Sequence, residues 1–359
     1  MAPRLLLPEP AAAAFRRQAD ACARMGSPFT AALCAAIANA GLPDGAVRDA
    51  LSGWPGIADN TGDAIPLRLT GALHRLVLDS LDAALAAIYP SQAEGSDGLI
   101  DAVHRAVLVH EAFILDFLKS PPQTNEVGRS ALLYPAFAWL AARLPSDFEI
   151  LEIGASAGLN QNFDRYAIDY GAWQAGDPAS PVRISCDWRS APPGALHFPE
   201  FSVIARYASD IEPVAISTQA ERTRLRSYVW PDQADRLARL DAALDLAARF
   251  PPRVERAAAA DWLEDRLSRP HAAPHRVLMH TVMWQYLPGA ERTRAETLIR
   301  EHGRTARPQT PFSWLRFEAD ASSPGGGILV TTWSGAPDDG ITHCLGRGDF
   351  HGRWIEWRG

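Results

Sequence analysis

The sequence has little lysine, little cysteine and no long apolar segment. Lys119 is the only lysine, so arginine supplies nearly all of the positive charge, and the formal net charge is −7. A protein that binds nucleic acid mainly through phosphates needs a strongly basic surface, so this class is not expected. No stretch approaches the ~20 apolar residues that cross a bilayer, and the apolar run before Pro8 is too short for a signal peptide. We therefore expect a cytoplasmic protein that binds neither nucleic acid nor membranes.

The small number of cysteines excludes two further classes. Cys22, Cys34, Cys186 and Cys344 show neither the paired spacing of a zinc site nor that of a redox motif. Reduced, buried thiols are typical of a cytoplasmic protein. No other cluster of metal-ligating residues is visible in the sequence, so we expect no metal cofactor.

Two patterns of apolar residues divide the chain. As far as about residue 120 the apolar spacing is helical throughout, with proline near helix starts and glycine near helix ends. From about residue 145, short apolar segments alternate with helices, which is typical of a parallel sheet. A chain of 359 residues also exceeds the usual size of one hydrophobic core. The sequence therefore predicts a helical N-terminal domain, residues 1–120, and an α/β domain, residues 121–359.

Seven strands are predicted in the α/β domain, with helices between most of them. The last two are joined by a turn-rich segment and are expected to form an antiparallel pair. Seven strands with such an ending are the arrangement of methyltransferases rather than of six-stranded dinucleotide-binding domains. The predicted strands are residues 148–153, 203–207, 254–258, 277–280, 312–318, 328–333 and 352–357.

The first of these strands leads into a glycine turn. The turn is Gly154-Ala155-Ser156-Ala157-Gly158, and Glu152 lies two positions before it. A helix is expected from residue 159. Small residues let the backbone turn tightly and approach a ligand, and a helix N-terminus offers free N–H groups. The segment resembles the cofactor turn of class I S-adenosylmethionine (AdoMet)-dependent methyltransferases, with serine for the middle glycine. The resemblance implies that AdoMet is the cofactor and that Glu152, Gly154, Ser156 and Gly158 bind it.

The same five residues also match the nucleophile elbow G-x-S-x-G of α/β-hydrolases. Asp349 and His351 follow Ser156 in the order that a catalytic triad would need. An elbow serine normally follows several strands, whereas the region before this turn is predicted to be helical, and Glu152 suits a cofactor site better. We favour cofactor binding and keep three alternatives: a serine hydrolase, a nicotinamide-dependent enzyme and a non-catalytic Rossmann-like binding protein.

Acids after the next two strands extend the resemblance. In class I methyltransferases the second strand ends in an acid that binds ribose, and an acid after the third lies near adenine. Asp210 and Asp261 hold these places, with Trp262 beside the ring. Asp210 lies further from the glycine turn than the ~20 residues usual for a ribose acid, which predicts an insertion at residues 170–201; without it, Asp187 is the ribose acid. Asp261 also fits as an N-cap of the helix at Trp262.

Residues after the fourth predicted strand are candidates for the acceptor pocket. In the family these positions face the methyl donor and acceptor, so the resemblance implies that Trp284 and Gln285 bind a small-molecule substrate. His280 and Tyr286 are the candidate catalytic residues, because a histidine can take a proton from an oxygen or nitrogen nucleophile. The simpler interpretation is a hydrogen-bonded core histidine and aromatic rings that serve only the core.

A polar segment lies at the predicted domain junction. Thr124, Asn125, Glu126 and Arg129 precede a helix that is expected to pack beside the glycine turn. Thr124 or Asn125 could cap that helix. Several hydrogen-bonding residues and an arginine are also what a ligand cleft would use, so all four are candidate substrate-binding residues.

The resemblance extends over nearly the full length of the chain and rests on four segments: QTNEVGR (123–129), LEIGASAGLN (151–160), VWPDQADRL (229–237) and HGRWIEW (351–357). Together they resemble an uncharacterised bacterial domain family with no established reaction. The resemblance implies a methyltransferase-like core. The expected fold is α/β, with a Rossmann-like, seven-stranded sheet of methyltransferase type preceded by an all-α domain. The expected function is AdoMet binding and methyl transfer to a small apolar or aromatic molecule.

Overall fold

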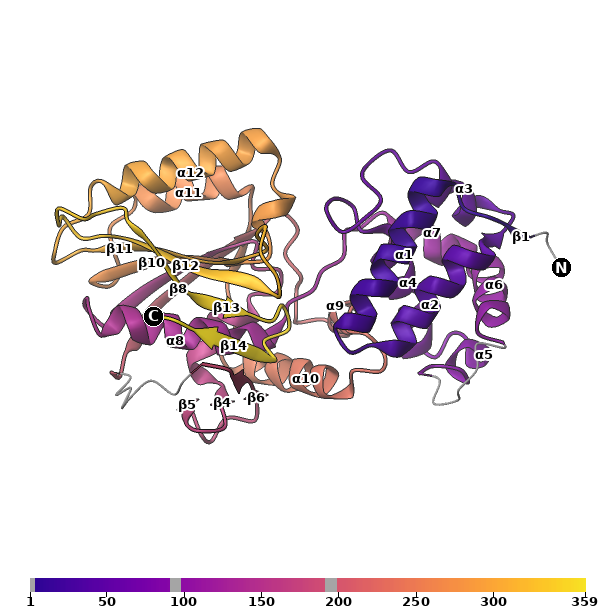
Figure 1. Cartoon of the computed structure of the whole chain (residues 1–359), viewed down its shortest axis with the longest axis horizontal. Helices are drawn as coiled ribbons and strands as arrows, with labels where there is room; N and C mark the ends of the chain where they lie inside the picture. Colours follow the sequence, from indigo (N-terminus) through magenta and orange to yellow (C-terminus); the bar gives the residue numbers. More distant parts are fainter. Residues whose placement is uncertain (1–3, 91–97, 191–198) are drawn as a thin grey trace. The chain divides into compact units, whose positions relative to one another are not determined.

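The computed structural model describes residues 4–90, 98–190 and 199–359, and the chain separates into two compact units (Figure 1). The helical unit comprises Met1–Thr124 and Ser217–Ala238, and the α/β unit comprises Asn125–Ile216 and Arg239–Gly359. The predicted division at residue 120 lies close to the first of these boundaries. The sequence did not predict that a segment from the second half of the chain belongs to the helical unit.

The helical unit packs its helices around one apolar core, which includes Phe15, Leu33, Leu69, Leu73 and Val103. Two short strands, β1 (Arg4–Leu5) and β2 (Leu42–Pro43), pair antiparallel at its edge. The helices are α1 (Glu9–Arg24), α2 (Pro28–Ala40), α3 (Ala46–Ser52), α4 (Ile65–Leu78), α5 (Ala83–Ala86), α6 (Leu99–Val109), α7 (Glu111–Leu118) and α9 (Gln219–Ser227).

Ser217–Ala238 belongs to the helical unit because its side chains complete the packing there. The Tyr228 ring lies against Gly71 of α4, where an added Cβ would come within 2.8 Å of it. The Asp232 carboxylate accepts the N–H of Phe29 in the first turn of α2 (2.9 Å), which stabilises that helix N-terminus. These contacts join residues that are 157 and 203 positions apart, so local periodicity does not report them.

The α/β unit is built on a sheet of nine strands in the order β7-β14-β13-β12-β11-β10-β3-β8-β9. The five neighbours β11, β10, β3, β8 and β9 are parallel, whereas β12, β13 and β14 continue the sheet as an antiparallel meander. The strands are β3 (Asp147–Ile153), β7 (Asp187–Trp188), β8 (Ser202–Asp210), β9 (Val254–Arg256), β10 (His275–Thr281), β11 (Phe312–Glu318), β12 (Gly326–Trp333), β13 (Thr342–Gly348) and β14 (Trp354–Trp357).

The sheet therefore has nine strands rather than the seven predicted. Each predicted strand is present, and β7 and β13 are the two additions. The sequence of β13, THCLGRG, contains two glycines and begins with three exposed residues, so it lacks the alternation of a half-buried strand. The predicted antiparallel pairing of the last two strands is wrong, because β12 and β14 each pair with β13, which lies between them. The unit is a mixed α/β fold with a large, mostly parallel sheet.

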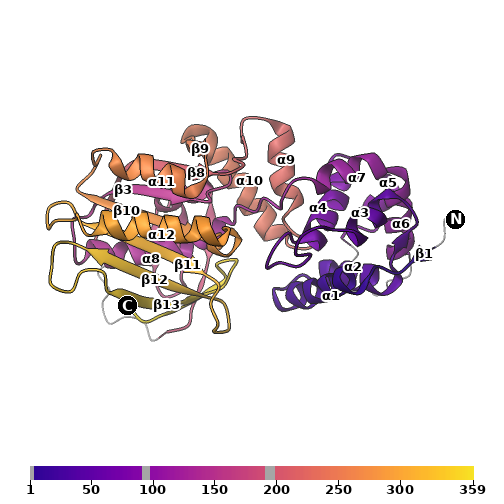
Figure 2. The same cartoon turned by 90° about the horizontal axis from the view of Figure 1, so that it is seen from above.

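Helices cover both faces of the parallel strands. In Figure 1, α11 (Ala259–Ser268) and α12 (Gly289–Gly303) lie above the sheet and α8 (Ser130–Ala141) lies below it; Figure 2 looks down on α11 and α12. Leu151 of β3 packs in the core that includes α11 and α12. Phe148 instead contacts Phe137 of α8, with 5.2 Å between ring centroids. Because side chains alternate along a strand, Glu152 shares the α8 face.

The predicted insertion, residues 170–201, begins a few residues earlier than expected. β4 (Ala167–Asp169), β5 (Gln174–Gly176) and β6 (Arg183–Ser185) form a separate three-stranded sheet. β7 then returns to the large sheet and pairs parallel with β14. Residues 191–198 of the predicted insertion lie outside the described residues.

Candidate functional site

The order of the parallel strands changes direction beside β3. β8 and β9 follow on one side of β3, whereas β10 and β11 lie on its other side. In open α/β sheets, ligands bind beyond the carboxyl ends of the strands at such a switch point. The candidate site is therefore the carboxyl edge, by which we mean the ends of β3, β8, β10 and β11 with the turns that follow them.

The glycine turn follows β3 as predicted, and its backbone is left-handed at three positions. The φ angles are +66° at Gly154, +55° at Ser156 and +73° at Gly158. A Cβ at Gly154 would lie 2.7 Å from the Met283 side chain, and one at Gly158 would lie 2.7 Å from Pro252. Both positions therefore require glycine for conformation and for space. Ser156 is strained, since residues with a Cβ rarely adopt this conformation.

The segment after the turn is not the α-helix that the sequence predicts. Leu159–Arg165 forms a short 3₁₀ helix, η2, in which Asn162 leaves the helical conformation. The Asn125 side chain accepts the N–H of Leu159 (2.8 Å), so the first donor of this helix is already used. A short, capped helix offers an anion little dipole and few free N–H groups. This weakens the nicotinamide alternative, whose pyrophosphate would bind there.

Asp210, at the end of β8, holds the glycine turn directly. Its Oδ2 accepts the N–H of Ser156 (2.7 Å) and its Oδ1 accepts the N–H of Glu212 (2.8 Å). Each carboxylate oxygen keeps a second lone pair for a ligand. The alternative ribose acid, Asp187, lies in β7 at the opposite edge of the sheet. The structure therefore brings Asp210, and not Asp187, to the turn.

Glu152 is buried near the end of β3, and its Oε2 accepts a hydrogen bond from Gln161 Nε2 (2.9 Å). Burial raises the pKa of its carboxyl group to about 8; the Gln161 hydrogen bond and the charge of Arg129 lower it, and the charge of Asp210 raises it. The group is therefore mostly protonated at neutral pH. A positive charge placed beside it would favour the carboxylate.

A chain of hydrogen bonds runs across the ends of β10 and β11. Trp314 Nε1 donates to His280 Nε2 (3.0 Å), and His280 Nδ1 contacts Glu318 Oε1 (2.6 Å). An indole N–H can only donate, so the imidazole proton lies on Nδ1 and is donated to Glu318. His280 is fully buried, and Trp284 stacks on it with 4.8 Å between ring centroids. Both imidazole nitrogens of His280 are therefore engaged within the protein, and a catalytic role for His280 stays a prediction.

Glu318 is the functional candidate that the sequence did not reveal. It ends β11, as Asp210 ends β8 and as Glu152 comes one residue before the end of β3. Its Oε1 also accepts the N–H of Met283 (3.1 Å). The resemblance to methyltransferases directed attention to acids after the first three strands only. A search for acids at the end of every predicted parallel strand would have found it.

The turn after β10 is strained and connects Glu318 with the glycine turn. Val282 has φ +54°, which is an outlier for a β-branched residue. Such residues persist where the surrounding structure enforces them, and they cluster at functional sites. This turn directs the N–H of Met283 to Glu318 and the Met283 side chain onto Gly154. The ends of β3, β10 and β11 therefore meet at Met283.

Arg129 joins the end of β10 to the turn between β13 and β14. Its Nη1 donates to the carbonyl oxygen of Thr281 and its Nε donates to that of Phe350, both at 3.0 Å. Gly128 lies so close to the same turn that a Cβ would come within 2.2 Å of the His351 carbonyl oxygen. The predicted polar segment thus frames the carboxyl edge.

The other members of that segment have capping or surface roles. Asn125 caps Leu159, and Glu126 Oε1 accepts the N–H of Gly128 (3.0 Å). The predicted cap is therefore wrong in its partner: Asn125 caps η2 rather than the helix that follows the segment, and Glu126 is the N-cap of the 3₁₀ turn Val127–Arg129. Thr124 is exposed and belongs to the helical unit. Binding of substrate by Thr124, Asn125, Glu126 or Arg129 stays a prediction.

Asp261 and Trp262 occupy different surroundings. Asp261 lies in the first turn of α11, with 65% of its side chain exposed, and pairs with Arg294 of α12. It is not the N-cap, which is Ala258. Trp262 is buried in the core between α11, α12 and the sheet. An adenine contact for this pair stays a prediction.

Trp284, Gln285 and Tyr286 form one turn of 3₁₀ helix, η3, after β10. Trp284 is half-buried against His280 and lies 5.5 Å from Trp314, measured between ring centroids. Tyr286 is 49% exposed. Of the three, Trp284 is the one that contacts the hydrogen-bonded chain, and the roles predicted for Gln285 and Tyr286 stay predictions.

Ser156 lacks the partner that a nucleophile needs. Its hydroxyl group is buried and has no hydrogen-bond partner among the described residues. His351 lies in the turn between β13 and β14, and β13 is separated from β3 by β12, β11 and β10. Asp349 pairs with Arg353 (2.8 Å). A serine nucleophile needs a base within hydrogen-bond reach, so the hydrolase alternative has no geometric support.

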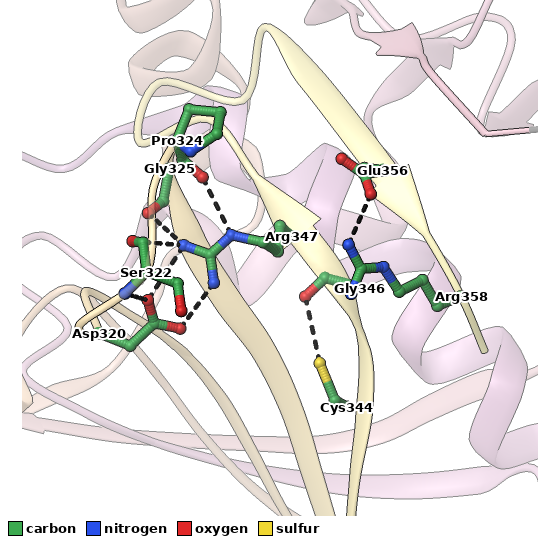
Figure 3. Close-up of polar contacts among 9 residues, drawn as sticks. All are labelled: Asp320, Ser322, Pro324, Gly325, Cys344, Gly346, Arg347, Glu356 and Arg358. Atoms are coloured by element: carbon green, nitrogen blue, oxygen red, sulfur yellow. Dashed lines mark hydrogen bonds and ion pairs between the residues drawn. The ribbon is translucent and has the colours of Figure 1, made fainter.

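The loop that follows Glu318 is held by Arg347 of β13, as Figure 3 shows. The guanidinium group contacts both carboxylate oxygens of Asp320 (2.7 and 3.0 Å). It also donates to the backbone carbonyls of residues 322, 324 and 325 at 2.8, 3.0 and 2.8 Å. Five hydrogen bonds therefore fix the loop that leaves the carboxyl end of β11.

An open hollow of about 450 Å³ belongs to the helical unit and is lined in part by Trp54 and Ile57. Its charged groups include Arg17 and Asp59, which pair with each other (2.7 Å). No chain of polar groups comparable to that of the carboxyl edge is formed there by the described residues. The carboxyl edge therefore remains the better candidate for chemistry.

Within the described ranges, no group of three or more His, Cys, Asp or Glu residues could hold a metal ion. In the same part of the chain, no helix has the length and apolar character needed to cross a membrane. The chain belongs to the family described as "Uncharacterized protein conserved in bacteria (DUF2332)", whose model matches residues 12–357. No curated protein and no solved structure matches it. The predicted membership of an uncharacterised bacterial family is confirmed, and this match carries no activity with it.

Proposed function

Starting from this family membership, we propose that the α/β unit binds AdoMet at the carboxyl edge and transfers its methyl group to a small molecule. The observation that carries the proposal is the hydrogen bond from Ser156 N–H to Asp210. It places an acid from the neighbouring strand against the glycine turn, where the ribose of a nucleoside cofactor would lie in a Rossmann-like core.

Five residues support cofactor binding. Gly154 and Gly158 let the backbone approach a ligand, and Asp210 retains lone pairs for ribose hydroxyl groups. Glu152, which is buried and accepts a hydrogen bond from the neutral Gln161 amide, suits the positively charged methionine end of AdoMet. The buried Ser156 hydroxyl group, which lacks a hydrogen-bond partner in the described part of the chain, is available to the same ligand.

AdoMet, when bound, supplies a methyl group on a positively charged sulfur. The contribution of the chain is to position and enclose the two reactants, which can supply most of the rate. Met283 covers Gly154, so its side chain has to turn aside when the methionine end of the cofactor enters. Its unbranched side chain makes this movement easy.

The test is isothermal titration calorimetry with AdoMet, S-adenosylhomocysteine and NAD. Asp210→Asn is expected to weaken AdoMet binding about tenfold or more, because it removes one charged acceptor. Asp187→Asn is the matched control and leaves binding unchanged. The proposal fails if neither AdoMet nor S-adenosylhomocysteine binds the wild-type protein at millimolar concentration. Labelling of Ser156 by a fluorophosphonate would instead favour the hydrolase.

A further inference from the structure

Glu318 has one oxygen committed to the protein and one available. Oε1 accepts hydrogen bonds from His280 and from the Met283 N–H. Oε2 is buried and has no hydrogen-bond partner among the described residues, while 15% of the side chain is exposed. A buried carboxylate oxygen without a donor costs free energy, because its desolvation is not compensated. The carboxylate is thus held at the border of the core with an unused acceptor.

Two aromatic rings contact His280, the residue that holds this carboxylate. Trp284 stacks on the imidazole, and Trp314 donates its indole N–H to Nε2. Trp284 is half-buried, so part of its ring faces solvent. Aromatic faces and a carboxylate together are the surroundings that proteins use to bind organic cations.

The charged side chains near Glu318 are engaged with other partners. Arg316, two residues earlier in β11, lies over the Trp314 ring at 4.1 Å and donates to Thr331 (2.8 Å). Arg316 makes no ion pair with Glu318 in the described ranges, although the charges of the two side chains interact electrostatically. The nearby α12 carries Glu296 and Arg300, which pair with each other (2.7 Å).

We propose that Glu318 and Trp284 form the acceptor subsite of the α/β unit, and that this subsite takes the ammonium group of a small apolar or aromatic amine. The proposal rests on the proposed function, since it names the acceptor for the same site. Met283 links the acceptor subsite to the glycine turn, because its N–H donates a hydrogen bond to Glu318 and its side chain contacts Gly154.

The reaction at this subsite balances without a further reactant. The ammonium group gives one proton to Glu318 Oε2, and the free amine nitrogen attacks the methyl carbon. The new C–N bond forms as the C–S bond breaks, and the electron pair of that bond stays on sulfur as S-adenosylhomocysteine leaves. His280 and Trp314 are positioning residues in this scheme, because they act through Glu318.

The first experiment measures binding of benzylamine, benzyl alcohol and phenylacetate by calorimetry at neutral pH, with S-adenosylhomocysteine present. These probes have similar shapes and carry a positive, a neutral and a negative group. Benzylamine is expected to bind about tenfold tighter than benzyl alcohol, and phenylacetate more weakly still. Equal binding of the amine and the alcohol, or no binding of the amine, overturns the proposal.

Two variants assign the effect to Glu318. Glu318→Gln keeps an oxygen that accepts from His280 and Met283 but places an N–H₂ donor where Oε2 lies, so the preference for the amine disappears. Glu264→Gln on α11 changes net charge equally at an exposed site and keeps the preference. An unchanged preference in Glu318→Gln contradicts the assignment.

The two proposals fail in different ways. If S-adenosylhomocysteine does not bind, the proposed cofactor is wrong, and the amine titration without it still shows whether a Glu318-dependent cation subsite exists. If S-adenosylhomocysteine binds and the amine preference is absent, the cofactor proposal survives and the acceptor subsite is wrong.

Discussion

Glu152 and Glu318 lie near the carboxyl ends of two parallel strands, yet the protein surrounds them differently. Glu152 is buried on the α8 face and accepts a hydrogen bond from the uncharged amide of Gln161. Glu318 borders the core and receives two hydrogen bonds on one oxygen, one of them from an imidazole that is itself held by Trp314. The comparison shows how surroundings give one residue type two proposed roles. Glu152 would become a carboxylate when a positive charge binds beside it, whereas the carboxylate of Glu318 is already held in one orientation by hydrogen bonds.

The largest effect is expected from Glu152→Gln. Because burial raises the pKa of Glu152 to about 8, the free energy of unfolding falls between about pH 4.5 and pH 8, as the unfolded chain loses a proton that the folded chain keeps. At pH 9 the variant is expected to be about 2–4 kcal/mol more stable than the wild type, and at pH 4 equally stable. Urea unfolding at both pH values measures this.

The same variant should lose AdoMet binding about a hundredfold, because the amide cannot become negative beside the cation. A protein that is more stable and yet does not bind would separate folding from function at this position. Full AdoMet binding by Glu152→Gln would remove Glu152 from the proposed cofactor site. Weaker stability at pH 9 would show that burial is not what sets its protonation.

Binding of AdoMet should be coupled to proton release from Glu152. A bound cation lowers the pKa of this carboxyl group from about 8, so affinity should rise between pH 6 and pH 8, by at most about tenfold per pH unit, and level off above. Calorimetry in two buffers with different ionisation enthalpies counts up to about one proton released. The same titration on Glu318→Gln should still release it, which sharpens the difference between the two acids. Binding that releases no proton at pH 7 would contradict the coupling.

A smaller effect is expected where Arg347 holds the loop after Glu318. Arg347→Lys keeps the charge but cannot reproduce the two-pronged contact with Asp320 or reach all three carbonyls. The free energy of unfolding should fall by about 1–3 kcal/mol. Arg358→Lys is the matched control in the same view (Figure 3), since Arg358 pairs with Glu356 at an exposed position. Thermal unfolding that ranks the control as the more damaging change would show that the loop is held otherwise.

The smallest effect is expected at the strained turn. Val282→Gly should change the free energy of unfolding by less than about 1 kcal/mol, because relief of the left-handed φ offsets the lost side chain. Val277→Gly, in the fully buried middle of β10, should cost about 3 kcal/mol or more. Similar losses at both positions in urea unfolding would mean that Val282 carries no strain.

Much of the α/β unit could be predicted because its signals are local. β3, β8 and β11 stand out as apolar runs, and the glycine turn after β3 has a left-handed backbone where small residues suggested a tight turn. β13 could not be predicted, because its glycines and exposed residues carry no alternation. The short helix η2 was taken for a longer one, since local sequence does not report that Asn125 caps its first N–H.

The sequence by itself determined the two kinds of secondary structure along the chain, the family, and the acids that end the strands. Hydrophobic periodicity and turn residues involve only a few neighbouring positions, so they can be recognised in the sequence without knowledge of the tertiary structure. Only the tertiary structure decided that Asp210 accepts a hydrogen bond from the glycine turn and that Trp314, His280 and Glu318 form one hydrogen-bonded chain. It also decided that Ser217–Ala238 belongs to the helical unit. Each of these depends on contacts between residues tens or hundreds of positions apart, which strand order and packing create.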